Sequence, residues 1–315
     1  MTPRRIVSLL PSATEIVCAL GLRDRLVGVS HECDHPADVV GLPILTAPKL
    51  DVHGSSREIH ESVGRLVGAG LSVYRIDTER LAELAPDLIV TQDQCDVCAV
   101  SYDEVVEATR ALAGSQAEVV SLKPRRLQDV WNDVRAVADA AGVAERGETL
   151  ARELEERVAG LAERTRRLER SRVACIEWLD PLMAAGNWVP ELAEAAGGTG
   201  ELVAAGAHSP WLDFAELERE APEVICAMPC GFDLARTEGE LRGVLDDPRW
   251  SRLPAVRLDR VFAVDGNAYF NRPGPRLVAS AEILAGLLHP EECGELVPRG
   301  AAARVSAAGA ARSRA

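Results

Sequence analysis

The sequence has no long apolar run, no excess of basic residues and few aromatic residues. No stretch approaches the roughly 18 consecutive apolar residues that a membrane-spanning helix needs, so no membrane span is expected. The 35 lysine and arginine residues are outnumbered by 49 aspartate and glutamate residues, which gives a net charge of −14. A protein that binds nucleic acid needs a basic face for the phosphates. The composition therefore argues against nucleic acid as a partner.

Several catalytic motifs are also missing. The chain has no phosphate-binding loop, no GxSxG or HExxH motif, and no paired carboxylates with an evident catalytic role. These absences favour a binding function, and we expect that the protein is not an enzyme.

The N-terminus lacks the pattern of a secretory leader. Only five mostly apolar residues, 6–10, precede Pro11, whereas a leader has a longer apolar centre and a small-residue cleavage site. Eight cysteines without such a leader suggest a reducing compartment, where thiols stay free or bind metal. We therefore predict a cytoplasmic location for the sequence as printed, and an extracytoplasmic one if it is a trimmed mature form.

Short β-rich runs alternate with helical patterns over the first 122 residues. Strands are predicted at residues 5–10, 26–30, 72–77, 87–92 and 117–122. Three Ser-x-x-Glu capping boxes, at Ser12, Ser55 and Ser101, predict helix starts. This alternation indicates an α/β fold with a mainly parallel sheet covered on both faces.

After residue 122 the alternation of strands and helices stops, and only helical patterns follow. Apolar residues recur with the helical period over residues 125–141, and a second helical pattern follows Gly142 up to about Arg170. So much helix without a strand is too long for one crossover, and it predicts a rigid connector between two lobes.

The alternation resumes in the second half of the chain. Strands are predicted at residues 172–179, 182–185, 223–228 and 260–265, followed by a helix over 275–288 and an Ala-rich, low-complexity end. The predicted organisation is an N-terminal α/β lobe at 1–122, a connecting helical segment at 123–171, a C-terminal α/β lobe at 172–290 and a disordered tail at 291–315.

One segment occurs twice. LAELAPDLIV at 81–90 matches LEREAPEVIC at 217–226, with Pro86 aligned to Pro222. Each reads as a helix end, a proline that stops the helix, an acidic residue and a buried strand. The repeat predicts two related lobes with a cleft between them, since ligands of open α/β sheets bind outside the carboxyl ends of the strands.

Four segments together resemble a known family. They are RIVSLLPSATEIVCALGL, LVGVSHECDHP, LAELAPDLIVTQ and NRPGPRLVASAEILAGLLHPE, within a resemblance that covers roughly residues 4–290. The family comprises substrate-binding proteins that carry chelated metals, such as vitamin B12, haem or iron–siderophore complexes, to ABC importers. The chain looks most like its cobalamin-binding branch.

The resemblance implies both a fold and a ligand. The fold is that of class III periplasmic binding proteins, or helical-backbone metal receptors: two Rossmann-like α/β lobes joined by a long rigid helix. The expected ligand is cobalamin or another bulky planar metal chelate held in the interlobe cleft. The expected partner is an ABC permease, and we expect the protein to be a monomer.

The candidate ligand-binding residues lie in loops at predicted strand ends. A large macrocycle needs aromatic faces for its bulk and a few polar groups for its orientation. Imidazole can also occupy an axial position on cobalt or haem iron. The candidates are His31, Tyr74, Gln94, Cys95, Trp178, Trp188, Phe232 and Asn267. The alternative for the tryptophans is that they fill gaps under loops.

The cysteines suggest a second kind of site. Cys95 and Cys98 form a Cys-x₂-Cys pair, but a tetrahedral zinc site normally needs four protein ligands. Cys33 and Cys230 are the candidates that would complete such a group. For the Cys95/Cys98 pair three interpretations stay open: a cleft-lining or metal-binding role, a redox pair ahead of a helix N-terminus, and local packing.

Acidic residues at predicted helix starts, Glu104 and Glu191, are candidates for docking to a permease, although a helix N-terminus also explains them. The main functional hypothesis is non-catalytic binding of a corrinoid or similar chelate, either for an importer or in a cytosolic carrier or sensor. The alternative is a cytosolic zinc- or thiol-dependent enzyme that uses Cys33, Cys95 and Cys98.

Overall fold

The computed structural model describes residues 5–69, 73–92, 117–200 and 202–306. The chain divides into two compact units. The first unit consists of Met1–Gly54, Glu58–Pro124 and Gln128–Leu154. The second unit consists of Ser55–Arg57, Arg125–Leu127 and Glu155–Ala315. None of the described helices is both long enough and apolar enough to cross a membrane.

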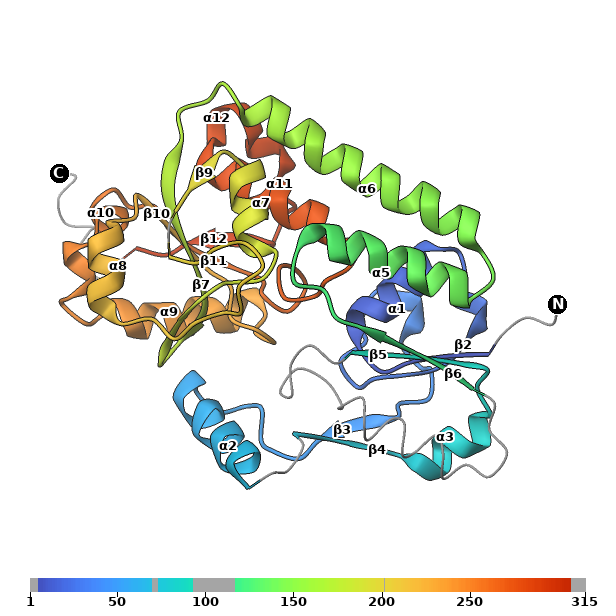
Figure 1. Cartoon of the computed structure of the whole chain (residues 1–315). Helices are drawn as coiled ribbons and strands as arrows, with labels where there is room; N and C mark the ends of the chain where they lie inside the picture. The colour runs from blue at the N-terminus through green and yellow to red at the C-terminus, as the bar shows by residue number, and fades with distance from the viewer. Residues whose placement is uncertain (1–4, 70–72, 93–116, 201, 307–315) are drawn as a thin grey trace. The chain divides into compact units, whose positions relative to one another are not determined.

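A four-stranded parallel sheet forms the centre of the first unit. Its order is β2 (Leu26–Val29), β1 (Ile6–Ser8), β5 (Leu88–Gln92) and β6 (Glu118–Leu122). Alternate side chains point to opposite faces, and Val7 and Ile89 pack with Leu81 in one buried cluster. Helices α1 and α5 lie on one face of the sheet and α3 lies on the other (Figure 1). The sheet is therefore covered on both sides, as the sequence predicts.

The first unit also contains helices and 3₁₀ turns. The helices are α1 (Pro11–Ala19), α2 (Ser56–Gly68), α3 (Thr78–Leu84) and α5 (Leu127–Ala140), with 3₁₀ turns η1 (Arg23–Arg25) and η2 (Ala37–Val39). The first two residues of α2 and the first residue of α5 belong to the second unit. Strands β3 (Thr46–Pro48) and β4 (Tyr74–Ile76) form a separate antiparallel pair, in which Pro48 is opposite Tyr74. This pair places Thr46 and Tyr74 near the end of β2.

The capping box predicted at Ser12 is wrong. Helix α1 begins at Pro11, its N-cap is Leu10, and no side chain caps it. Proline is favoured at the first helical position because its fixed φ suits the helix and its missing N–H is not needed there. The hydroxyl of Ser12 is consequently buried without a hydrogen-bond partner in the described structure. The box at Ser55 precedes α2, which begins at Ser56, and the box at Ser101 lies outside the described residues.

The predicted helical connector consists of two helices. Helix α5 ends at Ala140, and Gly142 adopts the left-handed conformation (φ +73°) before α6 (Ala144–Thr165) begins. Helix α6 has 22 residues, which corresponds to about 33 Å. Its residues up to Leu154 belong to the first unit, and those from Glu155 onward belong to the second. It ends at Thr165, some residues before the end expected from the sequence.

The second unit is built on a mixed sheet. Its order is β12 (Ala302–Arg304), β11 (Val261–Val264), β10 (Val224–Ala227), β7 (Ser171–Leu179) and β8 (Leu182–Ala184), with β9 (Gly198–Thr199) also paired to β7. The central strands β7, β10 and β11 are parallel, and β8 and β12 are antiparallel edges. The carboxyl ends of three parallel strands therefore lie together at one edge of the sheet.

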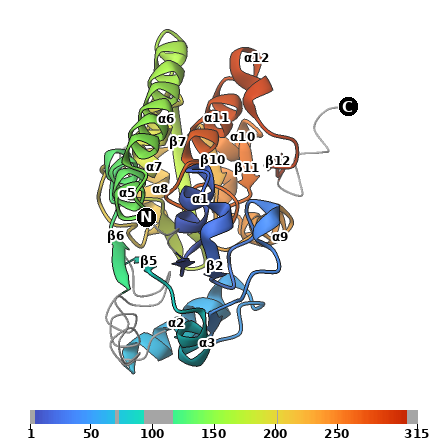
Figure 2. The same cartoon turned by 90° about the vertical axis from the view of Figure 1, so that its right-hand side faces the viewer.

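Helices cover both faces of this second sheet. Helices α7 (Val189–Ala195) and α11 (Leu277–Leu288) lie on one face, and α8 (Phe214–Glu220), α9 (Leu234–Leu245) and α10 (Pro254–Arg257) lie on the other (Figures 1 and 2). A buried cluster lies on the α8–α10 face and includes Phe214, Leu241 and Trp250 of the 3₁₀ turn η3 (Trp250–Arg252).

The tail predicted to be disordered from residue 291 is folded in its first part. It contains α12 (Pro290–Cys293), η4 (Gly294–Leu296) and β12, which pairs antiparallel with β11. Cys293 and Val305 are buried. The low-complexity composition was misleading, because small alanine side chains suit an edge strand that is anchored by a buried valine. Residues 307–315 lie outside the described part of the chain.

The internal repeat is confirmed at the level of backbone conformation. Helix α3 ends at Ala85 (φ +40°) before Pro86, and α8 ends at Ala221 (φ +46°) before Pro222. Proline disfavours the helical conformation in the residue before it, and in both repeats that residue is a left-handed alanine. A buried parallel strand follows in each case.

Candidate functional site

His31 follows the carboxyl end of β2 and is held by Thr46. Its Nδ1 lies 2.7 Å from Thr46 Oγ1, and its backbone N–H donates to the same oxygen at 3.1 Å. The imidazole ring also contacts the Tyr74 ring, with centroids 5.3 Å apart. Burial lowers the pKa of His31 below its usual value. The neutral imidazole, which is the form that can bind a metal, is thereby favoured.

Tyr74 and Glu32 complete this corner of the first unit. Tyr74 is half-buried in β4, and its hydroxyl donates to Glu32 Oε1 at 3.4 Å. Ser30 joins the same group, since Thr46 Oγ1 lies 3.0 Å from Ser30 Oγ. The first unit thus gathers imidazole, phenol, carboxylate and hydroxyl groups beside one strand end. His31 and Tyr74 are predicted from the sequence, whereas Thr46 is not, because no motif signals it.

Cys33 lies at the end of a chain of hydrogen-bonded hydroxyl groups. Its Sγ lies 3.0 Å from Thr14 Oγ1, which lies 2.8 Å from Ser8 Oγ. The Ser8 hydroxyl donates to the carbonyl of Leu10 at 2.9 Å. The described residues contain no group of three or more His, Cys, Asp or Glu side chains able to hold a metal ion. Gln94, Cys95 and Cys98 lie outside the described residues.

Trp178 and Phe232 form an aromatic pair in the second unit. Trp178 lies in β7 near its carboxyl end, and the two ring centroids are 5.3 Å apart. The indole N–H donates to the Ser56 carbonyl at 3.2 Å, within the same unit. The guanidinium of Arg236 lies 3.6 Å from the centre of the Phe232 ring. Trp178 is 9% exposed and Phe232 is 1% exposed, so this pair is packed into the unit.

Asn267 lies in the loop after β11 and is joined to Phe232 and Arg272. Its backbone N–H donates to the Phe232 carbonyl at 2.9 Å. Its side-chain Oδ1 accepts a hydrogen bond from Arg272 Nη2 at 2.9 Å. Arg272 is buried, with 6% exposure. Asn267 is predicted from the sequence, whereas Arg272 is not. The signal for Arg272 is the segment NRPGPR, in which a charged residue stands directly before a proline that restricts its backbone.

Contacts to backbone carbonyls join the loops after β10 and β11. The side-chain Nδ2 of Asn271 donates to the carbonyls of Met228 (2.8 Å) and Gly266 (2.9 Å). A Cβ at Gly266 would lie 2.3 Å from the Pro229 carbonyl oxygen, so only glycine allows this approach. These contacts fix the positions of Phe232 and Asn267 relative to each other.

Trp188 and Cys230 also lie beside these loops. Trp188 precedes α7, is 5% exposed, and its indole N–H donates to the Phe270 carbonyl at 2.7 Å. It therefore holds the far end of the loop that carries Asn267. Cys230 follows β10, is half-buried, and its backbone N–H donates to the Glu177 carbonyl at 3.4 Å.

Of the two candidate docking residues, Glu104 and Glu191, the structure describes only Glu191. Glu191 lies in the first turn of α7, and its Oε2 accepts a hydrogen bond from the Leu127 N–H at 2.9 Å. The Glu191 carboxylate thus satisfies an amide at the start of α5, which lacks a partner within the helix. Glu104 lies outside the described residues.

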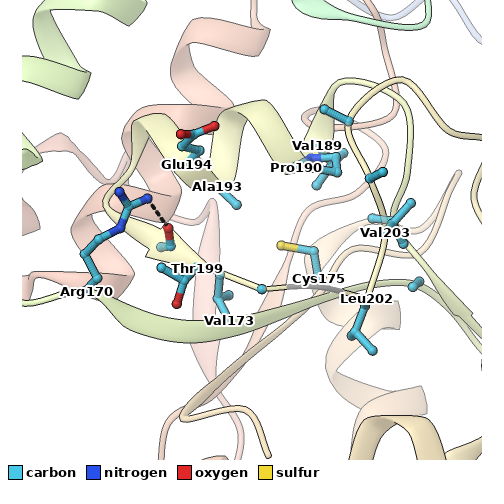
Figure 3. A pocket seen from close by; sticks show the side chains of 16 residues that line it. Arg170, Val173, Cys175, Val189, Pro190, Ala193, Glu194, Thr199, Leu202 and Val203 are labelled. Carbon is cyan, nitrogen blue, oxygen red and sulfur yellow. Dashed lines mark hydrogen bonds between the residues drawn. The ribbon is translucent and has the colours of Figure 1, made fainter. Parts of the chain in front are cut away.

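A cavity of about 400 Å³ lies elsewhere in the second unit (Figure 3). Its walls come from the amino-terminal half of β7, from α7, and from β9 with the segment after it, and most of the lining side chains are small and apolar. Cys175 faces this hollow, and burial raises the pKa of its thiol to about 12. The Arg170 guanidinium at the margin donates to the Gly198 carbonyl at 2.6 Å. None of the residues selected from the sequence lines this cavity.

A family model, curated relatives and a solved structure all match this chain over most of its length. The model of a family described as periplasmic binding protein matches residues 6–268. An uncharacterised ABC transporter substrate-binding lipoprotein of Bacillus subtilis is 23% identical over 92% of this chain and 81% of its own length. A vitamin B12-binding protein of Vibrio parahaemolyticus is 23% identical over 86% of this chain and 84% of its own. The solved structure of the periplasmic haem-binding protein RhuT from Roseiflexus superposes with a TM-score of 0.68 at 24% identity, covering 91% of this chain and 98% of RhuT.

These findings confirm the predicted fold class and contradict the predicted cytoplasmic location. The matched proteins are described as periplasmic or as lipoproteins, which are extracytoplasmic. The location was inferred from the first printed residues and from free thiols, and neither is informative. Cys175, Cys226 and Cys293 are buried, where a thiol packs as a small apolar group in any compartment. The cytosolic carrier and the zinc- or thiol-dependent enzyme likewise find no support among the matched proteins.

Proposed function

The chain belongs to the periplasmic binding protein family, and on that premise we propose that it delivers a corrinoid or haem-type metal chelate to an ABC importer. The observation that carries the proposal is the match to a vitamin B12-binding protein across 86% of the chain. The similarity to a haem-binding protein supports the same ligand class, a metal held in a large planar macrocycle. The protein acts by binding and releasing this ligand, without chemical change.

We assign the metal-facing role to the cluster in the first unit. His31 and Tyr74 have adjacent rings, and each carries an atom able to bind cobalt or iron. Thr46 restricts the rotation of the imidazole through the 2.7 Å contact to Nδ1, which leaves Nε2 as the nitrogen for a metal. The lowered pKa of His31 supports this role, since a protonated imidazole cannot bind a metal.

We assign the recognition of the macrocycle and its edge to the second unit. Trp178, Trp188 and Phe232 are packed beside the strand-end loops, and Trp178 contacts Phe232, so in this proposal the three rings support the loops that would face the macrocycle. Asn267 is half-buried in the same group of loops and carries a polar group suited to the edge of the ligand. A permease is the partner that this function requires, and Glu104 and Glu191 remain our candidates for contacting it.

A titration of the purified protein with cobalamin and with haem, followed by visible absorption, tests the proposal. We expect saturable one-to-one binding of at least one of the two chelates. The variant His31→Ala should change the absorption spectrum of the complex, because an axial ligand is lost. The matched control is His53→Ala, which removes an exposed histidine of the same unit and should leave the spectrum unchanged. If the folded protein binds neither chelate saturably, the proposal is wrong.

A further inference from the structure

Two cysteines occupy opposite positions on neighbouring strands of the second sheet. Cys175 of β7 is the register partner of Cys226 in the parallel ladder between β7 and β10. Register partners point to the same face of a sheet, and adjacent strands are about 4.8 Å apart. Ala174 and Ala227, the next residues along the two strands, belong to the buried cluster on the α8–α10 face. The two thiols therefore lie side by side on the opposite face, which α7 and α11 cover (Figures 1 and 2).

The cavity of about 400 Å³ gives access to one of these thiols. Cys175 faces the cavity from β7 (Figure 3), and most of the surrounding side chains are small and apolar. Cys226 lies one strand further on and is fully buried, and its register partner on the other side is Phe262 of β11. A small ion that enters the cavity therefore contacts Cys175 first, with Cys226 as the neighbouring thiol on the same face.

The spacing of the pair suits one metal ion held in line between two sulfur atoms. A metal–thiolate bond is about 2.3 Å long, so two thiolates on opposite sides of an ion are about 4.6 Å apart. This separation is close to the strand spacing of about 4.8 Å, so the strands need not move. A disulfide needs its Cβ atoms only about 3.8 Å apart, and both cysteines are free. The register thus favours a bridging ion over a covalent bond.

The number of ligands restricts the metals that the pair can hold. A structural zinc site has four ligands. Among the described residues, no third His, Cys, Asp or Glu side chain joins the two thiols in a group able to hold a metal ion. Thiolate ligands select soft ions, and Cu(I) and Hg(II) are soft ions that accept two thiolates in line. The pair therefore matches this class of ion and not zinc.

The two thiols are protonated before an ion binds. Burial raises the pKa of Cys175 to about 12, and burial together with the neighbouring Cys175 raises the pKa of Cys226 well above its usual value. A metal ion binds the thiolate form, so each ion displaces two protons. The complex with Hg(II) is then neutral, whereas the complex with Cu(I) carries one negative charge. The Arg260 guanidinium favours the charged form of Cys226 and so partly offsets that charge.

We propose that Cys175 and Cys226 form a binding site for one soft, two-coordinate metal ion of the Cu(I) or Hg(II) type, which enters through the cavity. Binding forms two metal–sulfur bonds and releases two protons, and no electron is transferred. None of the residues assigned to the chelate lines this cavity. The inference therefore goes beyond the proposed function and stands whether or not a chelate binds.

The test measures the binding of Cu(I) and of Hg(II) to the reduced full-length protein, without oxygen and against a competing chelator. Every sample carries Cys95→Ser and Cys98→Ser, so that the separate Cys-x₂-Cys pair does not contribute. We expect one ion per chain, two protons released per ion and a thiolate-to-metal absorption band. Cys175→Ser and Cys226→Ser should each weaken binding at least about a hundredfold, more than the loss of an outer-shell partner would.

The matched control is Cys293→Ser. It removes another buried thiol of the same unit, which lies in α12 and not in the sheet. This variant should leave the affinity and the number of released protons unchanged. If a serine at either sheet position prevents folding, Cys175→Ala and Cys226→Ala replace the serine variants, because alanine buries no unpaired hydroxyl group.

The outcomes also distinguish the two ions. Binding of Cu(I) that both sheet variants abolish assigns the site to the monovalent ion, and such binding of Hg(II) alone assigns it to the divalent ion. The inference is wrong if neither ion binds, or if Cys293→Ser weakens binding as much as the two sheet variants do. It is also wrong if Zn(II) binds as tightly as these ions. In each of these cases Cys175 and Cys226 only pack the interior of the second unit.

Discussion

The two units share a backbone motif but differ in the side chains that they place beside it. In both, a short helix ends in a left-handed alanine before a proline, and a buried parallel strand follows. Beside the strand ends of the first unit lie imidazole, phenol and thiol groups linked by hydroxyls. Beside those of the second lie indole and phenyl rings and an arginine–amide pair, linked largely to backbone carbonyls.

The two clusters should differ in how easily their hydrogen bonds rearrange after a substitution. A hydroxyl group can donate in one direction or another, so the network around Thr46 can rearrange when a neighbour changes. A backbone carbonyl can only accept and cannot turn as a hydroxyl does, and the rings of the second unit are almost fully buried. We therefore expect substitutions in the second cluster to reduce folding stability strongly, and substitutions in the first to affect ligand chemistry more than stability.

Phe232→Ala should have the largest effect on the free energy of unfolding. Phe232 is 1% exposed, and truncating so buried a ring typically lowers the free energy of unfolding by about 3–5 kcal/mol. Tyr74→Ala in the first unit removes a half-buried ring and should cost less than half as much. Urea denaturation of both variants measures the two losses. Equal losses would remove the proposed contrast between the clusters.

The next comparison is between alanine substitutions at Gly266 in the second unit and Gly28 in the first. A Cβ at Gly266 would lie 2.3 Å from the Pro229 backbone oxygen, whereas one at Gly28 would meet the Leu45 and Leu84 side-chain ends at 2.7 and 2.8 Å. Side-chain ends can move and a strand-end carbonyl cannot. Gly266→Ala should therefore lower the free energy of unfolding by about 2–3 kcal/mol, and Gly28→Ala by about 1 kcal/mol. The same denaturation series measures both, and a larger loss for Gly28→Ala would contradict the assignment.

The strands, the main helices and the repeat could be predicted because they depend on local patterns. Alternating and helical periodicities predicted β5, β7 and α11 to within a few residues, and prolines marked the ends of α3 and α8. The start of α1 and the fold of the tail could not be predicted in this way. In the first case Pro11 replaced a serine cap, and in the second an edge strand is stabilised by a distant partner, β11.

The site was predictable only in part for a similar reason. His31, Tyr74 and Asn267 could be selected because they follow or lie in predicted strands and carry suitable groups. Thr46 and Arg272 act through contacts with residues that are distant in the sequence or hidden in a loop, and no spacing rule indicates them. Such partners appear only once the chain is folded. The predicted domain limits and ligand contacts remain predictions.

A buried carboxyl group in the first unit predicts a pH effect of intermediate size. Burial, assisted by the nearby Asp129 charge, raises the pKa of Asp133 to about 7, and its Oδ2 has no hydrogen-bond partner among the described residues. Between about pH 4 and pH 7 the native state holds a proton that the unfolded state has lost, so stability falls as pH rises through this window. Asp133→Asn should remove this pH dependence of the free energy of unfolding.

The measurement is the free energy of unfolding at pH 5 and pH 8 for the wild type and the variant. Relative to wild type, Asp133→Asn should gain about 2 kcal/mol more at pH 8 than at pH 5. Asp139→Asn, at an exposed position of the same helix, is the control and should show no such difference. A constant difference between variant and wild type at both pH values would contradict the burial of an unpaired carboxyl group.

The smallest expected effect compares one histidine from each unit. Burial lowers the pKa of both His31 and His289. The unfolded state then binds more protons than the native state just below pH 6.5, so stability is present at higher pH and is lost as pH falls through this range. His31→Gln and His289→Gln should each flatten the decline between pH 7 and pH 5, by well under about 1 kcal/mol for the partly exposed His31 after solvent screening.

The two histidines should then differ in a second property. His31 is bonded to Thr46, whereas the Nε2 of His289 is buried without a partner in the described structure. Glutamine can keep a hydrogen bond to Thr46, so His31→Gln should leave stability at pH 7.5 almost unchanged while it changes the visible spectrum of the bound chelate. His289→Gln should change stability without changing that spectrum. The reverse pattern would place the metal-facing histidine in the second unit and would invert the comparison between the units.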